Sequence, residues 1–155
     1  MKHRTEIEVT AVHVDGTEAA RPAPGVLDAI ASAAAVIVAP SNPVVSIGPI
    51  LGVPGVREAL RATKARAAAI SPIIGGKTIK GPADRMMASL GMEATATGVA
   101  RAYADFLDVL VLDEEDRDLA PSVEAAGVRA VVAPTIMSGP AEKRALAEAV
   151  LAAVQ

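Results

Sequence analysis

The sequence contains no cysteine and no tryptophan, and it has one tyrosine and one phenylalanine. Without cysteine, the chain can form neither a disulfide framework nor a thiolate metal site. No apolar run approaches the roughly 18–20 residues that span a bilayer, and the basic start lacks the apolar segment of a signal peptide. We therefore expect a cytoplasmic protein with no membrane partner.

The sequence also has little net charge and no cluster of basic residues. The net charge is −3, and the lysines and arginines are scattered along the chain rather than clustered. A nucleic-acid-binding protein carries a basic patch or stripe, which this pattern does not predict.

Aliphatic residues dominate what is present. Hydrophobic residues make up 52% of the chain, and nearly all of them are alanine, valine, leucine or isoleucine. A chain of 155 residues can bury a substantial core. We expect residues 1–155 to form one domain with slim helices and an aliphatic sheet.

Short apolar runs alternate with helical patterns along the chain. The pattern predicts strands over residues 6–11, 34–39, 67–70, 108–112 and 128–133, and helices over residues 24–33, 55–63, 83–90, 95–107, 119–126 and 141–154. Residues 6–11 alternate between apolar and polar, as in a half-buried strand at a sheet edge. Strands separated by helices predict an α/β fold with a parallel sheet flanked by helices.

The first candidate binding segment is residues 40–51, PSNPVVSIGPIL, which follows the predicted strand 34–39. Ligands in open α/β sheets bind at the carboxyl ends of strands. Ser41, Asn42 and Ser46 can donate hydrogen bonds to an anion or a base edge, and Pro43 stiffens the loop that holds them. The alternative is a proline-rich connection with polar filler.

The second candidate segment is residues 71–82, which follows the predicted strand 67–70. Its glycines allow close approach to a ligand and can form an anion nest. The segment does not match the phosphate-loop pattern, because Ser71 stands where that pattern needs glycine. The predicted nucleotide- or phosphate-binding residues of this segment are Ser71, Pro72, Gly75, Gly76, Lys77, Lys80 and Gly81. The alternative is a mobile glycine loop with solvated lysines.

An acidic cluster, Asp113, Asp116 and Asp118, follows the predicted strand 108–112. Such a cluster can hold magnesium, but it more often caps the next helix. No side chain in the sequence is identified as a nucleophile or a general base.

The two segments carry a family resemblance. PSNPVVSIGPIL, then ISPIIGGKTIKGPADRMMASLG, then a helix with Gly98 and Tyr103, resembles the carboxyl-terminal half of the 2-phospho-L-lactate transferase family, also known as phosphoenolpyruvate transferases. The resemblance runs from about Pro24 to Leu151 and implies a Rossmann-like fold.

The resemblance also implies an activity. Family members transfer a phosphorylated three-carbon acid, 2-phospholactate or enolpyruvyl phosphate, from a guanosine diphosphate-linked donor to the deazaflavin precursor Fo, in coenzyme F(420) biosynthesis. Magnesium assists, with its ligands expected in the half that this chain does not contain. The chain is therefore expected to be a truncated or split version of the family fold.

Two other functions remain open. One is a non-catalytic module that binds nucleotides or nucleotide-sugars, as in the related gluconeogenesis-factor branch. The other is an interaction role, in which this half pairs with a separate amino-terminal half or forms a homo-oligomer, because the unpaired edge of an incomplete sheet seeks a partner.

Overall fold

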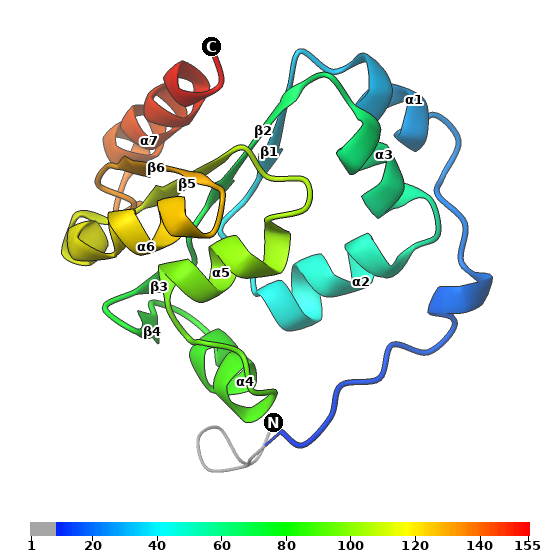
Figure 1. The fold of residues 1–155 in the computed structure, drawn as a ribbon, viewed down its shortest axis with the longest axis horizontal. Coiled ribbons are helices and arrows are strands. Elements are labelled where there is room, and N and C mark those ends of the chain that lie inside the picture. Colours follow the sequence, from blue (N-terminus) through cyan, green and yellow to red (C-terminus); the bar gives the residue numbers. More distant parts are fainter. Residues whose placement is uncertain (1–8) are drawn as a thin grey trace.

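A computed structural model describes residues 9–155 of the chain. Its centre is a parallel sheet of four strands in the order β1-β2-β5-β6 (Figure 1). The strands are β1 (Ala35–Val38), β2 (Arg66–Ile70), β5 (Val109–Leu112) and β6 (Arg129–Val132). The predicted α/β fold with a parallel sheet is confirmed.

Seven helices connect and cover these strands within the described residues. They are α1 (Val26–Ser32), α2 (Gly48–Gly52), α3 (Val56–Ala62), α4 (Ala83–Ser89), α5 (Ala96–Tyr103), α6 (Ala120–Ala125) and α7 (Pro140–Ala153). Each predicted helix is present. Helix α5 is shorter than predicted, because the N–H groups of Phe106 and Leu107 both turn back to the carbonyl of Tyr103.

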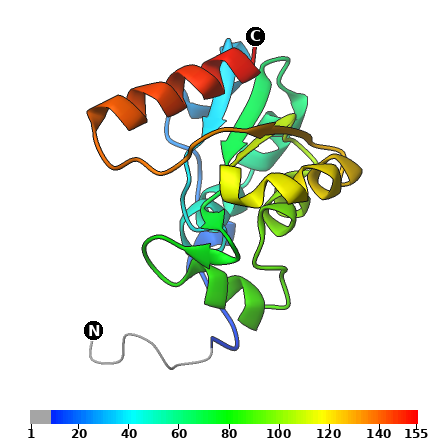
Figure 2. The ribbon, with the colours of Figure 1, turned by 90° about the vertical axis from the view of Figure 1, so that its left-hand side faces the viewer.

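The sheet separates two apolar cores, because successive side chains of a strand point to opposite faces. Ala67 and Ala69 of β2 face the larger core, which is formed with α3, α5 and α6, whereas Ala68 and Ile70 face a smaller core under α7. Figure 2 shows α7 on one side of the sheet and α5 and α6 on the other. Strands β2 and β5 are thus buried on both faces.

Residues 40–51 are not the open loop that the sequence predicts. They form a π-helical turn, η2 (Pro43–Ile47), which continues directly into α2. The N–H groups of Ser46 and Ile47 both donate to the carbonyl of Asn42, at 3.1 and 3.0 Å. Proline tolerates the first helical turn, where its missing N–H is not needed, so the prolines here begin helical structure rather than prevent it.

Residues 71–82 contain a hairpin rather than a featureless glycine loop. Strands β3 (Ile73–Ile74) and β4 (Lys77–Thr78) pair antiparallel, and Gly75 and Gly76 form the turn between them. Both glycines have positive φ, 56° and 75°. Two-residue hairpin turns commonly need positive φ at both positions, which glycine adopts without strain.

The predicted strand over residues 6–11 is wrong where it can be compared. Residues 6–8 lie outside the described part of the chain, and residues 9–14 have no regular secondary structure. A strand needs a neighbour for its backbone hydrogen bonds. Among residues 9–155 none pairs with this segment, and β1 forms the edge of the sheet.

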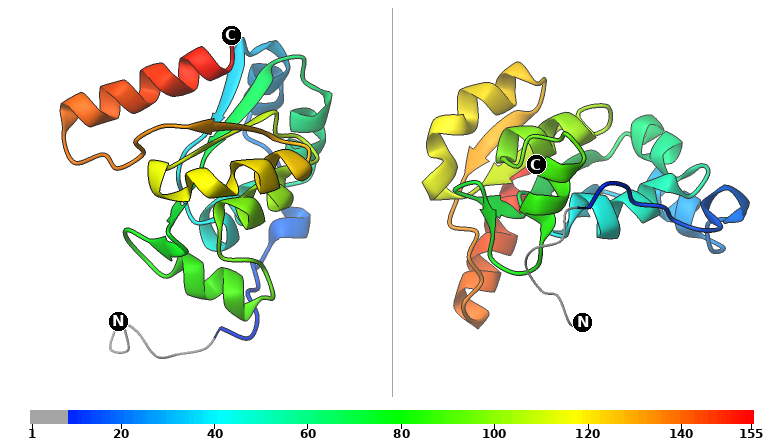
Figure 3. Two further views of the ribbon diagram at one scale, coloured as in Figure 1. Left: turned by 60° about the vertical axis from the view of Figure 1, so that its left-hand side comes forward. Right: turned by 90° about the horizontal axis from the view of Figure 1, so that it is seen from below.

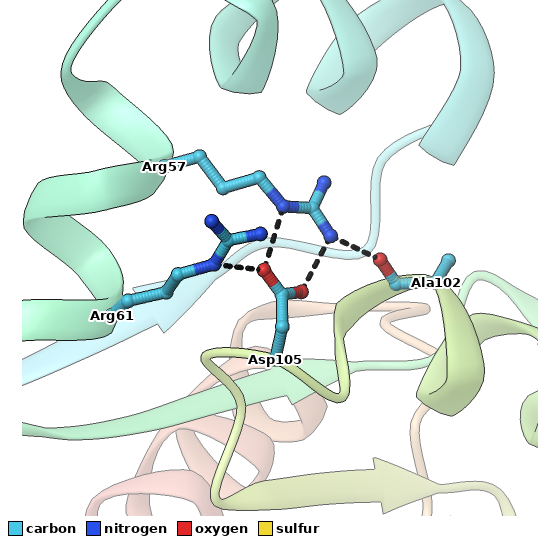
Figure 4. A network of polar contacts seen from close by, with 4 residues as sticks. All are labelled: Arg57, Arg61, Ala102 and Asp105. Atoms are coloured by element: carbon cyan, nitrogen blue, oxygen red, sulfur yellow. Dashed lines mark hydrogen bonds and ion pairs between the residues drawn. The ribbon is translucent and has the colours of Figure 1, made fainter.

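Helix α3 is tied to the end of α5 by a network of polar contacts (Figure 4). Arg57 donates to Asp105 Oδ2 at 2.8 Å and to the carbonyl of Ala102 at 2.9 Å, and Arg61 donates to the same carboxylate. The Arg57 guanidinium also lies 5.5 Å from the centre of the Phe106 ring. The network anchors the group of α1, α2 and α3, which lies at the other end of the molecule from α7 (Figure 3).

This network predicts a pH-dependent contribution to stability. Hydrogen bonds from Arg57, helped by those from Arg61, lower the pKa of Asp105 from 3.8 to about 2. Because the folded-state pKa is lowered, the contribution is present above pH 3.8 and is lost as the pH falls towards 2. Exposed ion pairs contribute about 0.2–1 kcal/mol.

We expect Asp105→Asn to lower the denaturant midpoint at neutral pH, with the difference from wild type closing as the pH falls below 3.8. Glu148→Gln is the matched control, because Glu148 pairs with Arg144 on the exposed side of a single helix. A pH-independent effect of Asp105→Asn would contradict the assignment.

Candidate functional site

A cavity of about 260 Å³ lies at the carboxyl ends of β1 and β2. Its walls come from the segments that follow β1, β2 and β6, together with the β3–β4 hairpin and the start of α4. The lining residues are Pro40, Asn42, Ser71, Pro72, Ile74, Thr78, Ile79, Lys80, Ala83, Thr135, Ile136 and Met137. The two predicted segments therefore meet in one cavity, because the carboxyl ends of neighbouring parallel strands share one edge of the sheet.

Asn42 both holds the local backbone and faces the cavity. Its Oδ1 accepts hydrogen bonds from the N–H groups of Val44 at 2.8 Å and Val45 at 3.2 Å, so the side chain caps η2. Its Nδ2 donates to the sulfur of Met86 at 3.4 Å. A thioether is a weak acceptor. A phosphate oxygen in the cavity would be a better partner for that amide.

Ser71 is almost completely buried at the base of the hairpin. Its hydroxyl donates to the carbonyl of Ile73 at 2.9 Å and accepts from the N–H of the same residue at 3.2 Å. The hydroxyl proton is therefore used to fix the start of β3. Thr78 is engaged in a similar way, because its hydroxyl lies within hydrogen-bond distance of two acceptors, the Gly81 carbonyl at 2.7 Å and Asp84 Oδ1 at 3.0 Å.

Only some of the predicted binding residues line the cavity. Asn42, Ser71, Pro72 and Lys80 do, whereas the others lie outside its lining: Ser41, Pro43, Ser46, Gly75, Gly76, Lys77 and Gly81. Of the two turn glycines, Gly75 faces acidic groups. The N–H of Gly75 donates to Asp116 Oδ1 at 3.1 Å, and a Cβ on Gly75 would lie 2.2 Å from Glu115 Oε1.

The sequence did not indicate the third wall of the cavity. Thr135, Ile136 and Met137 follow β6, and the last two expose 48% and 42% of their surface. Asp113, at the end of β5, accepts from the N–H and the hydroxyl of Thr135, both at 2.8 Å. The other two segments were predicted as binding segments because each has polar residues directly after a predicted strand. Thr135 meets the same criterion, because it follows β6.

Asp113 and Asp116 serve the local structure. Burial opposes ionisation of Asp113, but hydrogen bonds from Thr135 and from the N–H of Glu115 outweigh it and hold its pKa below the usual value. Burial raises the pKa of Asp116, and the charges of Glu115 and Asp113 add to that effect. Asp113 also caps η3 (Glu114–Leu119), as the capping interpretation of the cluster predicts.

The described residues do not fit a magnesium site. No group of three or more histidine, aspartate or glutamate residues in the described part of the chain is arranged to hold a metal ion. No carboxylate lines the cavity. Magnesium prefers carboxylate and phosphate oxygens, so a metal ion would need ligands from outside these residues.

The chemistry of the cavity suits an anion. Among the described residues, the lining includes the Lys80 ammonium and the Asn42 amide but no carboxylate. It also includes the apolar side chains of Ile79, Ile136 and Met137. A ligand that has both a phosphate and an apolar or planar part would match these two groups of residues.

A larger groove, of about 370 Å³, lies at the other end of the sheet, near the starts of β2 and β5. It is lined partly by Arg61, Asp105 and Asp108. Arg61 and Asp105 already form an ion pair with each other, so neither charge is free to pair with a ligand in the groove.

No helix in residues 9–155 is long and apolar enough to cross a membrane.

Comparison with known proteins identifies the family. The family model described as "2-phospho-L-lactate transferase CofD" matches residues 1–145. The chain is 45% identical over 139 residues to a phosphoenolpyruvate transferase of Streptomyces griseus, a match that covers 89% of this chain and 44% of the relative. It is 47% identical over 131 residues to a 2-phospho-L-lactate transferase of Methanothermobacter thermautotrophicus, covering 84% of this chain and 42% of that one.

The fold has a counterpart among solved structures. The crystal structure of protein BH3568 from Bacillus halodurans, a member of the UPF0052 family, matches with a TM-score of 0.57 at 18% identity. The match covers 84% of this chain and 47% of that one. This chain spans less than half the length of these curated relatives. Since a family model matches nearly the whole chain, the protein belongs to the 2-phospho-L-lactate transferase family.

Proposed function

We propose that this chain supplies the donor-binding part of a transferase in coenzyme F(420) biosynthesis. The complete activity moves a phosphorylated three-carbon acid, 2-phospholactate or enolpyruvyl phosphate, from a guanosine diphosphate-linked donor to Fo. The observation that carries the proposal is the meeting of Asn42, Ser71 and Lys80 in one cavity at the carboxyl ends of adjacent parallel strands.

The reaction assigns a limited task to this chain. The terminal hydroxyl oxygen of Fo forms a bond to the phosphorus that carries the acid. The bond from that phosphorus to the GMP oxygen breaks, GMP leaves, and the hydroxyl proton passes to solvent. Transfer of this kind depends mainly on positioning and on neutralising phosphate charge. Lys80 and the Asn42 amide, which both line the cavity, would perform the second task.

The described cavity lacks the other requirements of the reaction. Its lining includes no histidine and no carboxylate that could remove the hydroxyl proton or bind a metal ion. Binding of one part of a donor does not by itself lower the barrier at the reacting phosphorus. We therefore expect the magnesium ligands and most contacts to Fo to come from the region that the longer relatives have and this chain lacks.

A chimera tests the function directly. In it, this chain replaces the matching 139 residues of the Streptomyces griseus enzyme. With donor, Fo and magnesium, the chimera is expected to release GMP and form product, whereas this chain alone binds GDP weakly and forms none. A folded chimera that binds GDP without transfer would favour the nucleotide-binding module instead. Turnover by this chain alone would contradict the division of tasks.

A substitution of Asn42 can separate the two roles of its side chain, the cap of η2 and the proposed contact to a ligand. Asn42→Asp keeps an oxygen to cap η2 but replaces the amide donor with a negative charge beside the phosphate. We expect this variant to melt at nearly the wild-type temperature and to bind GDP at least about tenfold more weakly, a loss of about 1.4 kcal/mol. Asn42→Ala should in addition lose about 0.5–2 kcal/mol of stability with the cap.

Calorimetry with GDP and thermal unfolding, measured on both variants, check this prediction. Unchanged GDP affinity in Asn42→Asp would show that Asn42 serves only as the cap.

Lys80 and Lys77 form a matched pair that tests how much a lysine charge contributes to GDP binding. Both are exposed and lie on the same hairpin segment, but only Lys80 lines the cavity. We expect Lys80→Ala to weaken GDP binding several-fold at low salt, with a smaller effect at high salt, because screening weakens the lost attraction. Lys77→Ala should have little effect. Equal effects of the two substitutions on GDP titrations would place the phosphate elsewhere.

A further inference from the structure

The β3–β4 hairpin needs support from the rest of the fold. Within residues 9–155 its two strands pair only with each other, as a sheet separate from the main one. A two-stranded hairpin by itself is at best marginally stable in water. The segment from Ser71 to Lys80 nevertheless supplies six of the twelve residues that line the cavity. The position of Lys80 at the cavity therefore depends on what holds the hairpin in place.

The base of the hairpin is fixed to the main sheet. Ile73 is completely buried in the larger core, and the N–H of Ser71 donates to the carbonyl of Val111 in β5 at 2.8 Å. The turn at Gly75 and Gly76 comes after both of these contacts and is exposed. Contacts at the base leave the turn to be held by something else.

The turn is held by η3, the segment that follows β5. The N–H of Gly75 donates to Asp116 Oδ1 at 3.1 Å, and Asp116 exposes only 5% of its surface. The backbone of the turn also lies directly against Glu115, because a Cβ on Gly75 would lie 2.2 Å from Glu115 Oε1. The segments after β1, β2 and β6 line the cavity, whereas the segment after β5 supports the hairpin that lines it.

The contact between the turn and Asp116 does not require a negative charge. Asp116 Oδ2 is buried and has no hydrogen-bond partner among residues 9–155. Burial raises the pKa of Asp116, and the charges of Glu115 and Asp113 add to that effect. The Gly75 N–H needs only an acceptor, which the amide oxygen of an asparagine also supplies. The acceptor and the charge of Asp116 can therefore be tested separately.

We propose that Asp116 is a positioning residue for the ligand-binding cavity, which holds the β3–β4 hairpin against η3 through the Gly75 N–H and so keeps Lys80 at the cavity. Asp116 does not itself line the cavity, so it acts through the hairpin. The inference rests on the proposed function, because it takes Lys80 to contact the phosphates of the donor. The support of the hairpin by Asp116 does not depend on what the cavity binds.

Electrostatics alone predicts the opposite effect on ligand binding. GDP is an anion, so removing a negative charge near the cavity should strengthen its binding. Removing the support of the hairpin should weaken its binding, because Lys80 would then be in place for only part of the time. A hairpin that is in place about a third of the time raises the apparent Kd about threefold. The direction of the change therefore separates the two effects.

Three variants test the proposal. Asp116→Ala removes the acceptor, Asp116→Asn keeps an acceptor without the charge, and Asp118→Ala is the matched control, because it removes a charge from an exposed position of the same segment. Calorimetry measures GDP affinity. Amide hydrogen exchange without ligand measures how well β3 and β4 remain paired, apart from the Gly75 amide itself.

We expect Asp116→Ala to exchange faster in β3 and β4 and to bind GDP at least about threefold more weakly. Asp116→Asn and Asp118→Ala should retain wild-type exchange and should bind GDP no more weakly than wild type. In a chain that already carries Lys80→Ala, Asp116→Ala should cause little further loss of affinity, because the two residues act through one contact.

Several results would overturn the proposal. Unchanged exchange in β3 and β4 of Asp116→Ala would show that Asp116 does not support the hairpin. Faster exchange with unchanged or tighter GDP binding would show that the hairpin does not position the ligand. Equal losses of affinity in Asp116→Asn and Asp116→Ala would assign the effect to the charge.

Failure of the proposed function gives a different result. If the wild-type chain does not bind GDP, the proposed function fails, and exchange in β3 and β4 decides whether Asp116 positions the hairpin. If Asp116→Ala does not fold, Asp116→Asn decides. Exchange and GDP affinity equal to wild type would support the role of the acceptor, and a loss of either would overturn it.

Discussion

Parallel pairing of β1, β2, β5 and β6 is the constraint from which the rest of the structure follows. Pairing in parallel requires a crossover after each strand, and the crossovers form the helical layers on the two faces. It also directs all four carboxyl ends to one edge of the sheet. The segments after β1, β2 and β6 therefore meet, although Asn42 and Thr135 are far apart in the sequence. The cavity is a consequence of strand direction.

The polar residues that line the cavity also hold the local backbone. Asn42 caps η2, Ser71 fixes the first residue of the hairpin, and Thr135 is bonded to Asp113 at the end of β5. Groups held in this way lose little freedom when a ligand binds, which favours affinity. The same arrangement limits what they can donate. The Asn42 amide, bonded to a thioether, is the group most readily redirected to a phosphate.

Two independent features accord with a chain that spans less than half the length of its curated relatives. Among the described residues, the cavity is lined by a lysine, an amide and apolar side chains but by no carboxylate. The sheet has an apolar edge at β1, where its cover stops. One feature concerns chemistry and the other concerns packing, and the matches cover 44% and 42% of two longer relatives.

Periodicity by itself predicted the four strands of the parallel sheet and the helices α1 and α3 to α7, because buried strands and amphipathic helices have distinct repeats. The shared direction of the strands then predicted that the two motif segments meet. Periodicity failed where the outcome depends on neighbours. Prolines after β1 began a helical turn because Asn42 caps it, and Gly75 and Gly76 closed a hairpin because Ile73 and Ile74 found a partner strand. Residues 9–11, the described part of the predicted strand 6–11, have no strand beside them. Only tertiary packing decided which hydrogen-bond donors remain available for a ligand and left β1 uncovered at the edge of the sheet. The physical reason is that burial and hydrogen bonding depend on residues distant in the sequence.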